Sequence, residues 1–133
     1  MSRGLRNCNP GNIRHSRSKF VGEVRPSQDS AFKQFESMAY GYRAMFVLLD
    51  SYHRRYGLTT IRQMISRWAP PTENFTDGYI RFVSERTGIS ADTPVDSRSE
   101  RDMVPIVAAM SEIENGAKAV MADLHEGWVL FVR

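Results

Sequence analysis

Glu114 is the residue whose position best suits acid–base chemistry. Apolar residues recur at helical spacing from Met103 to Ile113, and position 114 lies four residues after Met110, at the edge of that apolar face. A carboxyl group there is partly removed from water, which raises its pKa toward the range that suits a general acid. The alternative is a structural role, in which Glu114 pairs with an arginine or marks the end of the helix before Asn115-Gly116.

A second group of candidates lies in the stretch "WAPPTENFT". Trp68 and the two prolines are expected to form a stiff wall, with Glu73 and Asn74 directed into a groove where they hydrogen-bond amide or hydroxyl groups. Glu73 is then the second catalytic candidate. The structural alternatives are a core position for Trp68, which continues the preceding apolar pattern, a helix cap for Asn74, and a favourable charge near a helix N-terminus for Glu73.

Three further carboxylates lie in the first third of the chain. Asp29 opens "DSAFKQF" and is the candidate for a second catalytic carboxylate, although loop aspartates usually cap turns. Glu23 follows Gly22 in the predicted hairpin, where it either faces a groove or, as we expect, is an exposed strand residue. Glu36 directly precedes Ser37, a capping residue, and therefore indicates the start of a helix.

The stretch "RNCNPGNIR" predicts a rigid polar turn near the N-terminus. Asn9-Pro10-Gly11 sets the backbone of a tight turn. Asn7, Asn12 and Arg14 are then candidates to line a ligand groove. The alternatives are that the asparagines satisfy only their own turn and that Arg14 is a surface charge. The stretch contains no acidic residue, so a proton donor must come from elsewhere.

Several other kinds of site are not expected. His15, His53 and His125 are far apart and lack metal-ligand spacing, so we predict no metal site. Cys8 is the only cysteine, which excludes an internal disulfide. Phosphate-binding loops and serine-nucleophile motifs do not occur, and no cofactor is predicted.

Composition indicates an ordinary globular chain. Of the 133 residues 41% are apolar and 25% charged, and the net charge of +3 is too small and too dispersed to predict nucleic-acid binding. No segment has the apolar length of a membrane span or of a signal peptide. We therefore expect synthesis in the cytoplasm without a signal peptide, and release to the cell wall or association with a virion only through another agent.

These side chains must be positioned by a hairpin-rich part at residues 1–36 and a helical part at 37–126, followed by an apolar tail at 127–133. Helices are predicted from Ser37 to Gly57, from Thr59 or Thr60 to Trp68, from Asn74–Thr76 to Gly88, from an N-cap at Asp102 to Asn115, and after Gly116. The predicted class is α+β and mainly α. Residues 1–133 are expected to form a single domain of four to five short helices beside a small N-terminal hairpin region.

The chain resembles the phage and prophage virion-associated proteins of lysozyme-like type. The resemblance rests on "RGLRNCNPGNIR", "DSAFKQFESMAYGYRAM", "GLTTIRQMISRWAPPTENFTDGYI" and "IENG", in that order, and runs from Arg3 to about Gly116. Phe20 departs from the family pattern, in which a tryptophan is expected before Val21-Gly22. A fainter likeness joins the asparagine-rich segment to cell-wall glucosaminidases, which also act on peptidoglycan.

The resemblance implies a lysozyme-like fold and cleavage of peptidoglycan glycan strands, as a muramidase or a lytic transglycosylase. Glu114 would be the acid, assisted by Glu73 or Asp29, and other virion proteins would be further partners. Glycosidic cleavage needs a carboxylic acid to protonate the leaving oxygen. The alternative is a non-catalytic virion component or glycan-binding module.

A permuted arrangement follows from the position of the candidate acid. In the glucosaminidase pattern the acid lies on a helix before the asparagine-rich segment, but here no acidic residue precedes Asn7. We therefore expect a circularly permuted lysozyme-like fold in which the acid-bearing helix comes last and packs back against the N-terminal hairpin.

Overall fold

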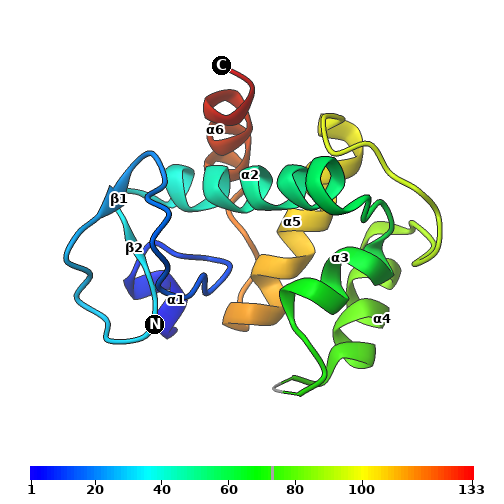
Figure 1. The fold of residues 1–133 in the computed structure, drawn as a ribbon, viewed down its shortest axis with the longest axis horizontal. Coiled ribbons are helices and arrows are strands. Elements are labelled where there is room, and N and C mark those ends of the chain that lie inside the picture. The colour runs from blue at the N-terminus through cyan, green and yellow to red at the C-terminus, as the bar shows by residue number, and fades with distance from the viewer. Residues whose placement is uncertain (73) are drawn as a thin grey trace.

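The computed structural model describes residues 1–72 and 74–133, and helices dominate this part of the chain. The longest helix, α2, runs through the middle of the molecule, between an N-terminal part with a small sheet and a group of helices on the other side (Figure 1). The predicted α+β class, mainly helical, is confirmed. The described elements are α1 (Arg3–Arg6), β1 (Glu23–Val24), β2 (Gln34–Phe35), α2 (Met38–Tyr56), α3 (Ile61–Trp68), α4 (Thr76–Thr87), α5 (Glu100–Asn115) and α6 (Met121–Val132).

Helix α2 forms where the sequence predicts it. The Ser37 hydroxyl accepts a hydrogen bond from the Tyr40 amide at 3.3 Å, which satisfies one of the free amides of the first turn. Gly57 ends the helix in the left-handed region, at φ 66°. The buried face packs into the core and consists of Ala39, Gly41, Tyr42, Ala44, Met45, Phe46, Leu49 and Asp50.

The small sheet is an antiparallel pair in which Glu23 lies opposite Phe35 and Val24 opposite Gln34. The expectation that Glu23 is exposed is wrong, because its side chain is buried and forms an ion pair with the fully buried Lys33, Nζ to Oε1 at 3.0 Å. Arg25 adds a second pair at 2.8 Å. A buried carboxylate needs such partners, because an isolated buried charge is strongly unfavourable.

The predicted start of α5, with Asp102 as its N-cap, is wrong. The cap is Ser99, whose hydroxyl accepts from the Asp102 amide at 3.3 Å, and the helix begins at Glu100. Pro105 therefore lies beyond the first turn. Proline has no amide hydrogen, so the carbonyl of Arg101, an exposed residue one turn earlier, loses its helical partner. The end of the helix is as predicted, with Gly116 at φ 67°.

The expectation of an apolar tail after Gly127 is wrong, because α6 continues through it to Val132. Gly127 does not end the helix but lets α6 approach α2 closely. A Cβ atom at this position would lie 2.8 Å from the Tyr42 Cβ and 2.9 Å from the Ala39 carbonyl oxygen. Trp128 and Phe131 then pack on Phe46, with ring centroids 5.0 and 5.9 Å away.

The described residues form six helices rather than four or five. The unpredicted one is the short α1, which Ser2 caps. The acid-bearing α5 is not the last element, since α6 follows it, but its end does pack against the N-terminal part. The Asn115 amide donates to the Pro10 carbonyl at 2.9 Å, and Ser2 Oγ donates to Asn115 Oδ1 at 2.7 Å.

Helix α4 lacks the side-chain cap that the sequence suggests. Its N-cap is Phe75, and no side chain bonds the first free amides. The predicted caps have other partners: Asn74 Nδ2 donates to the Pro70 carbonyl at 3.2 Å, and the Thr76 hydroxyl donates to the Ala69 carbonyl. None of the helices in the described residues combines the length and apolar character needed to cross a membrane.

Candidate active site

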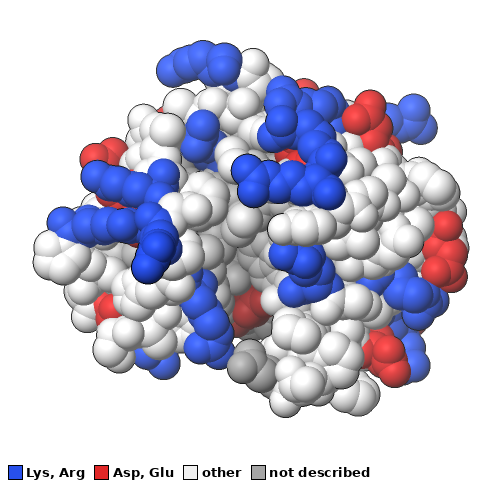
Figure 2. Space-filling view, viewed as in Figure 1, with Lys and Arg blue, Asp and Glu red and all other residues white. Residues whose placement is uncertain are grey.

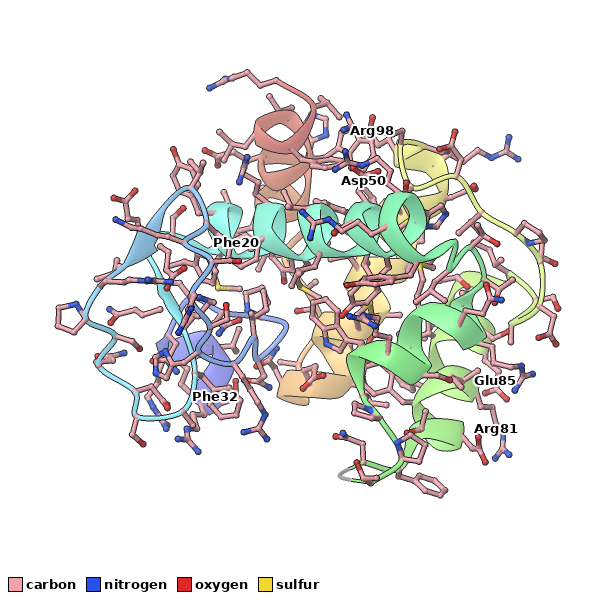
Figure 3. The ribbon with its side chains drawn as sticks, viewed as in Figure 1. Phe20, Phe32, Asp50, Arg81, Glu85 and Arg98 are labelled. Atoms are coloured by element: carbon pink, nitrogen blue, oxygen red, sulfur yellow. The ribbon has the colours of Figure 1, made fainter. Side chains whose placement is uncertain are left out.

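A cleft of about 310 Å³ separates the N-terminal turn from α3, with the end of α5 between them. Figure 2 shows a hollow on this face with acidic atoms inside it and Lys and Arg side chains around its rim. Phe32, labelled in Figure 3, lies on the N-terminal side. The described lining residues are Gly11, Asn12, Ile13, Arg14, Phe32, Leu48, Tyr52, Trp68, Ala69, Asn74 and Glu114.

Glu114 is the one acidic side chain among the described lining residues of this cleft, and side chains from the turn and from α4 donate hydrogen bonds to its carboxyl group. Asn12 Nδ2 donates to Oε1 at 2.9 Å, and the Tyr79 hydroxyl donates to Oε2 at 3.0 Å. The sequence-predicted acid therefore lies in direct contact with the "RNCNPGNIR" turn, from which it is separated by 102 positions in the chain.

The pKa of Glu114 is raised above the usual glutamate value. Burial is the largest cause, because it removes water from the charged form, and hydrogen bonds from Asn12, Tyr79 and Trp68 oppose it without cancelling it. Glu114 also occupies the last turn of α5, where the helix dipole disfavours a negative charge. A carboxyl group that stays protonated at higher pH can act as a general acid.

Asn12 is held in a conformation that suits this contact. Its φ is 50°, in the left-handed region that asparagine tolerates better than most residues. Its Oδ1 is buried and has no hydrogen-bond partner among the described residues. The neighbouring Gly11 lets the turn lie against the indole of Trp68, since a Cβ there would come within 2.7 Å of the Trp68 ring.

Trp68 belongs both to the core and to the cleft wall. Its half-buried ring packs against the hydrophobic core and meets Tyr52 edge-on, with centroids 6.3 Å apart. The exposed part of the ring faces the cleft. The two interpretations of Trp68 that the sequence left open are thus compatible.

A second groove of about 400 Å³ begins on the other side of Glu114. It shares Glu114 and Asn74 with the first cleft, so the carboxyl group lies where the two meet. Phe75, which is 82% exposed, lies on its rim together with Phe82 and Ile113. A chain-like ligand placed along both grooves would therefore pass over the Glu114 carboxyl group.

Asn7 and Asp29 are brought together, but not at either groove. Asn7 is buried and donates to Asp29 Oδ2 at 3.1 Å. Asp29 also accepts from the Ala31 amide at 2.8 Å and pairs with Arg3 at 2.6 Å. The Arg3 hydrogen bond is the main reason that the pKa of Asp29 is far below its usual range. These contacts describe a turn anchor.

The remaining predicted site residues lie at the cleft or outside the described residues. Asn12, Arg14, Trp68 and Asn74 line the cleft beside Glu114. Glu73, the second catalytic candidate, falls outside the described residues. Within the residues that the structure describes, no group of three or more His, Cys, Asp or Glu side chains is arranged to hold a metal ion.

Sequence reasoning missed two aromatic residues of the site. Tyr79 is buried on α4, and its hydroxyl reaches Glu114. Tyr52 lies on the apolar side of α2 and still lines the cleft. Spacing shows only which face of a helix is buried. An OH group at a buried position is the available indication of a polar contact, because such groups usually find a partner.

No protein-family model matches the chain. One known relative is protein P5 of Pseudoalteromonas phage PM2, which is 36% identical over 126 residues. The match covers 92% of this chain and 76% of that protein. Identity at this level over most of both sequences shows common descent. The chain therefore belongs to the family of the phage PM2 protein P5.

Proposed function

We propose that this protein is a lysozyme-like enzyme of phage or prophage origin that cleaves the glycan strands of peptidoglycan, with Glu114 as the general acid. The observation that carries the proposal is the half-buried Glu114 carboxyl, whose pKa is raised, at the meeting point of two grooves. A saccharide strand lying in both grooves would have a glycosidic oxygen beside this carboxyl group. The resemblance to lysozyme-like virion-associated proteins supports the same substrate.

The hydrogen-bond donors around Glu114 suit both stages of such a reaction. The protonated carboxyl donates its proton to the leaving oxygen as the glycosidic bond breaks. The carboxylate that remains then accepts from Asn12 and Tyr79, at 2.9 and 3.0 Å. Donors already in place stabilise the developing negative charge without reorganisation, so they favour proton transfer.

The cleft walls suit an N-acetylated sugar strand. Trp68 lines the first cleft, where its ring can contact a pyranose, and Asn74 lines both grooves. The walls combine an aromatic surface with a few polar groups, as in other sites for small neutral ligands. Asn12 and Arg14 line the opposite side.

Hydrolysis and transglycosylation differ in what attacks the sugar. A muramidase uses water and usually a second carboxylate, whereas a lytic transglycosylase uses the substrate's own hydroxyl and can work with one. Glu114 is the sole acidic residue among the described residues of both grooves. Both reactions keep Glu114 as the acid, and the chemical ends of the products distinguish them.

The alternative is a non-catalytic virion component that binds glycan. Membership of a family that includes a phage protein favours an assembly role with other virion proteins as much as an enzymatic one. This alternative predicts a protein that binds sacculi and leaves them intact.

Zymography with purified sacculi, followed by mass spectrometry of the soluble products, tests the proposal. We expect a clearing zone and fragments with either reducing ends or anhydro-sugar ends, the first from hydrolysis and the second from transglycosylation. The absence of clearing and of soluble fragments, from a folded protein that still sediments with sacculi, would support the binding alternative and refute the enzyme.

A further inference from the structure

The cleft continues past Ile13, Arg14 and Leu48 into a third groove of about 630 Å³. Its floor is the solvent-facing side of α2, and its opposite wall is the loop after Arg14. We call this groove the basic arm. Phe20, which lines it, is labelled beside α2 in Figure 3.

The charges in the basic arm all have one sign. Lys19, Arg43 and Arg55 line it, and no described lining residue is acidic. None of these three side chains forms an ion pair with a described carboxylate. Figure 2 shows Lys and Arg side chains gathered over α2 and the N-terminal part on this face.

Six arginines outside the basic arm are paired with acidic residues. Arg3, Arg25, Arg54, Arg62, Arg86 and Arg98 each pair with a carboxylate at 2.6 to 3.3 Å. Three cations that lack a carboxylate partner among the described residues lie together in one groove, and they create a positive potential that attracts anions into it.

The spacing along α2 gives the basic arm an extended shape. Arg43, Val47, Ser51 and Arg55 follow one another every four residues and all line the groove. The two arginines are therefore about 18 Å apart along the helix. A peptide of six extended residues spans about 20 Å, so such a chain would reach from one arginine to the other.

We propose that the basic arm binds the carboxylate-bearing peptide stems of the peptidoglycan strand whose sugars occupy the cleft. This inference rests on the proposed function, because it places the stem beside a strand at Glu114. Peptide stems carry free carboxylates and small apolar side chains. The cations Lys19, Arg43 and Arg55 match the first, and the apolar surface of Phe20, Val21 and Val47 matches the second.

Binding to purified sacculi that carry no phosphate groups, measured by sedimentation, tests this assignment. The non-cleaving Glu114→Gln protein is compared with the same protein carrying Lys19→Gln, Arg43→Gln and Arg55→Gln. The matched control carries Arg101→Gln, Lys118→Gln and Arg133→Gln, which removes equal charge from exposed sites outside the arm. Each protein is also tested on sacculi whose carboxylates have been converted to neutral amides.

We expect the arm variant to bind untreated sacculi about tenfold more weakly than the control variant, as expected from three exposed charge contacts. On amidated sacculi the two variants should bind equally. Equal binding of both variants to untreated sacculi would overturn the inference, and so would a difference that persists after amidation. Fragment release is measured separately, with the protein in which Glu114 is intact. If no fragments are released but the arm variant binds more weakly as expected, the proposed function is contradicted and the arm assignment is not.

Discussion

The contact between Tyr79 and Glu114 leads to a prediction about stability and pH. The Tyr79 ring is buried and its hydroxyl donates to Glu114 Oε2 at 3.0 Å. Tyr79→Phe keeps the ring and removes only this donor. A hydrogen bond to a charged group contributes about 1.5–3 kcal/mol, and one between neutral groups about 0.5–1.5 kcal/mol. The substitution should therefore cost more where Glu114 is ionised.

The sign follows from the raised pKa of Glu114. Since folding favours the protonated form, this residue makes the folded state less stable as pH rises from the usual glutamate pKa through the raised one. Tyr79→Phe removes a donor that stabilises the carboxylate, so it raises this pKa further. At a pH well above the raised pKa, the variant should lose about 1.5–3 kcal/mol of unfolding free energy. At a pH well below the raised pKa, the loss should be clearly smaller.

Urea denaturation of both proteins at the two pH values measures this difference. Tyr42→Phe is the matched control, because its buried hydroxyl pairs with the neutral Ser111 hydroxyl at 2.8 Å. The control should lose a similar free energy at both pH values. The assignment of the contact would be refuted if the unfolding free energy lost on Tyr79→Phe did not change with pH. It would also be refuted if this loss stayed pH-dependent in a protein that carries Glu114→Gln.

Three further predictions follow from the packing and the cleft. Gly127→Val should lower the unfolding free energy by about 1–3 kcal/mol in urea denaturation, because the added atoms would meet α2 at under 3.0 Å; unchanged stability would contradict the close helix contact. Asp29, whose pKa is lowered mainly by Arg3, contributes stability that is present above the usual aspartate pKa and lost as pH falls through the lowered one. Asp29→Asn should therefore flatten the acid side of a stability curve measured against pH, and a curve of unchanged steepness would argue against the turn anchor. In a Glu114→Gln and Trp128→Phe protein, N-acetylglucosamine oligomers should change the fluorescence of Trp68 in a saturable way; a similar change in a Trp68→Phe protein that keeps Trp128 would show that the signal does not come from the cleft.

Helices with clear caps and apolar spacing could be predicted from the sequence. Ser37 and Gly57 bound α2, and Thr60 bounds α3, because capping chemistry is local and depends on residues a few positions apart. The segment after Gly127 could not be recognised as helix, because the role of this glycine is not local. That glycine is present because α2 passes close by, and such a contact involves residues far apart in the chain.

The candidate site was partly within reach of sequence reasoning. The apolar face of α5 places Glu114 at its edge, and "RNCNPGNIR" indicates a rigid turn. The contact between Asn12 and Glu114, and the hydroxyl of Tyr79, depend on how α4, α5 and the turn pack together. Burial of Glu23 with Lys33 could not be foreseen, because a two-residue strand has too little periodicity to show which face is buried.

The rate at which soluble fragments leave purified sacculi tests the role of Glu114 most directly. Glu114→Gln keeps the size of the side chain and removes the acid, while Glu112→Gln changes a carboxylate on the same helix that pairs with Arg86 at 2.6 Å outside both grooves. We expect Glu114→Gln to slow release by about 10²–10⁴-fold and Glu112→Gln to leave it nearly unchanged. Release by Glu114→Gln at the rate of the unsubstituted protein would contradict the assignment of Glu114 as the acid.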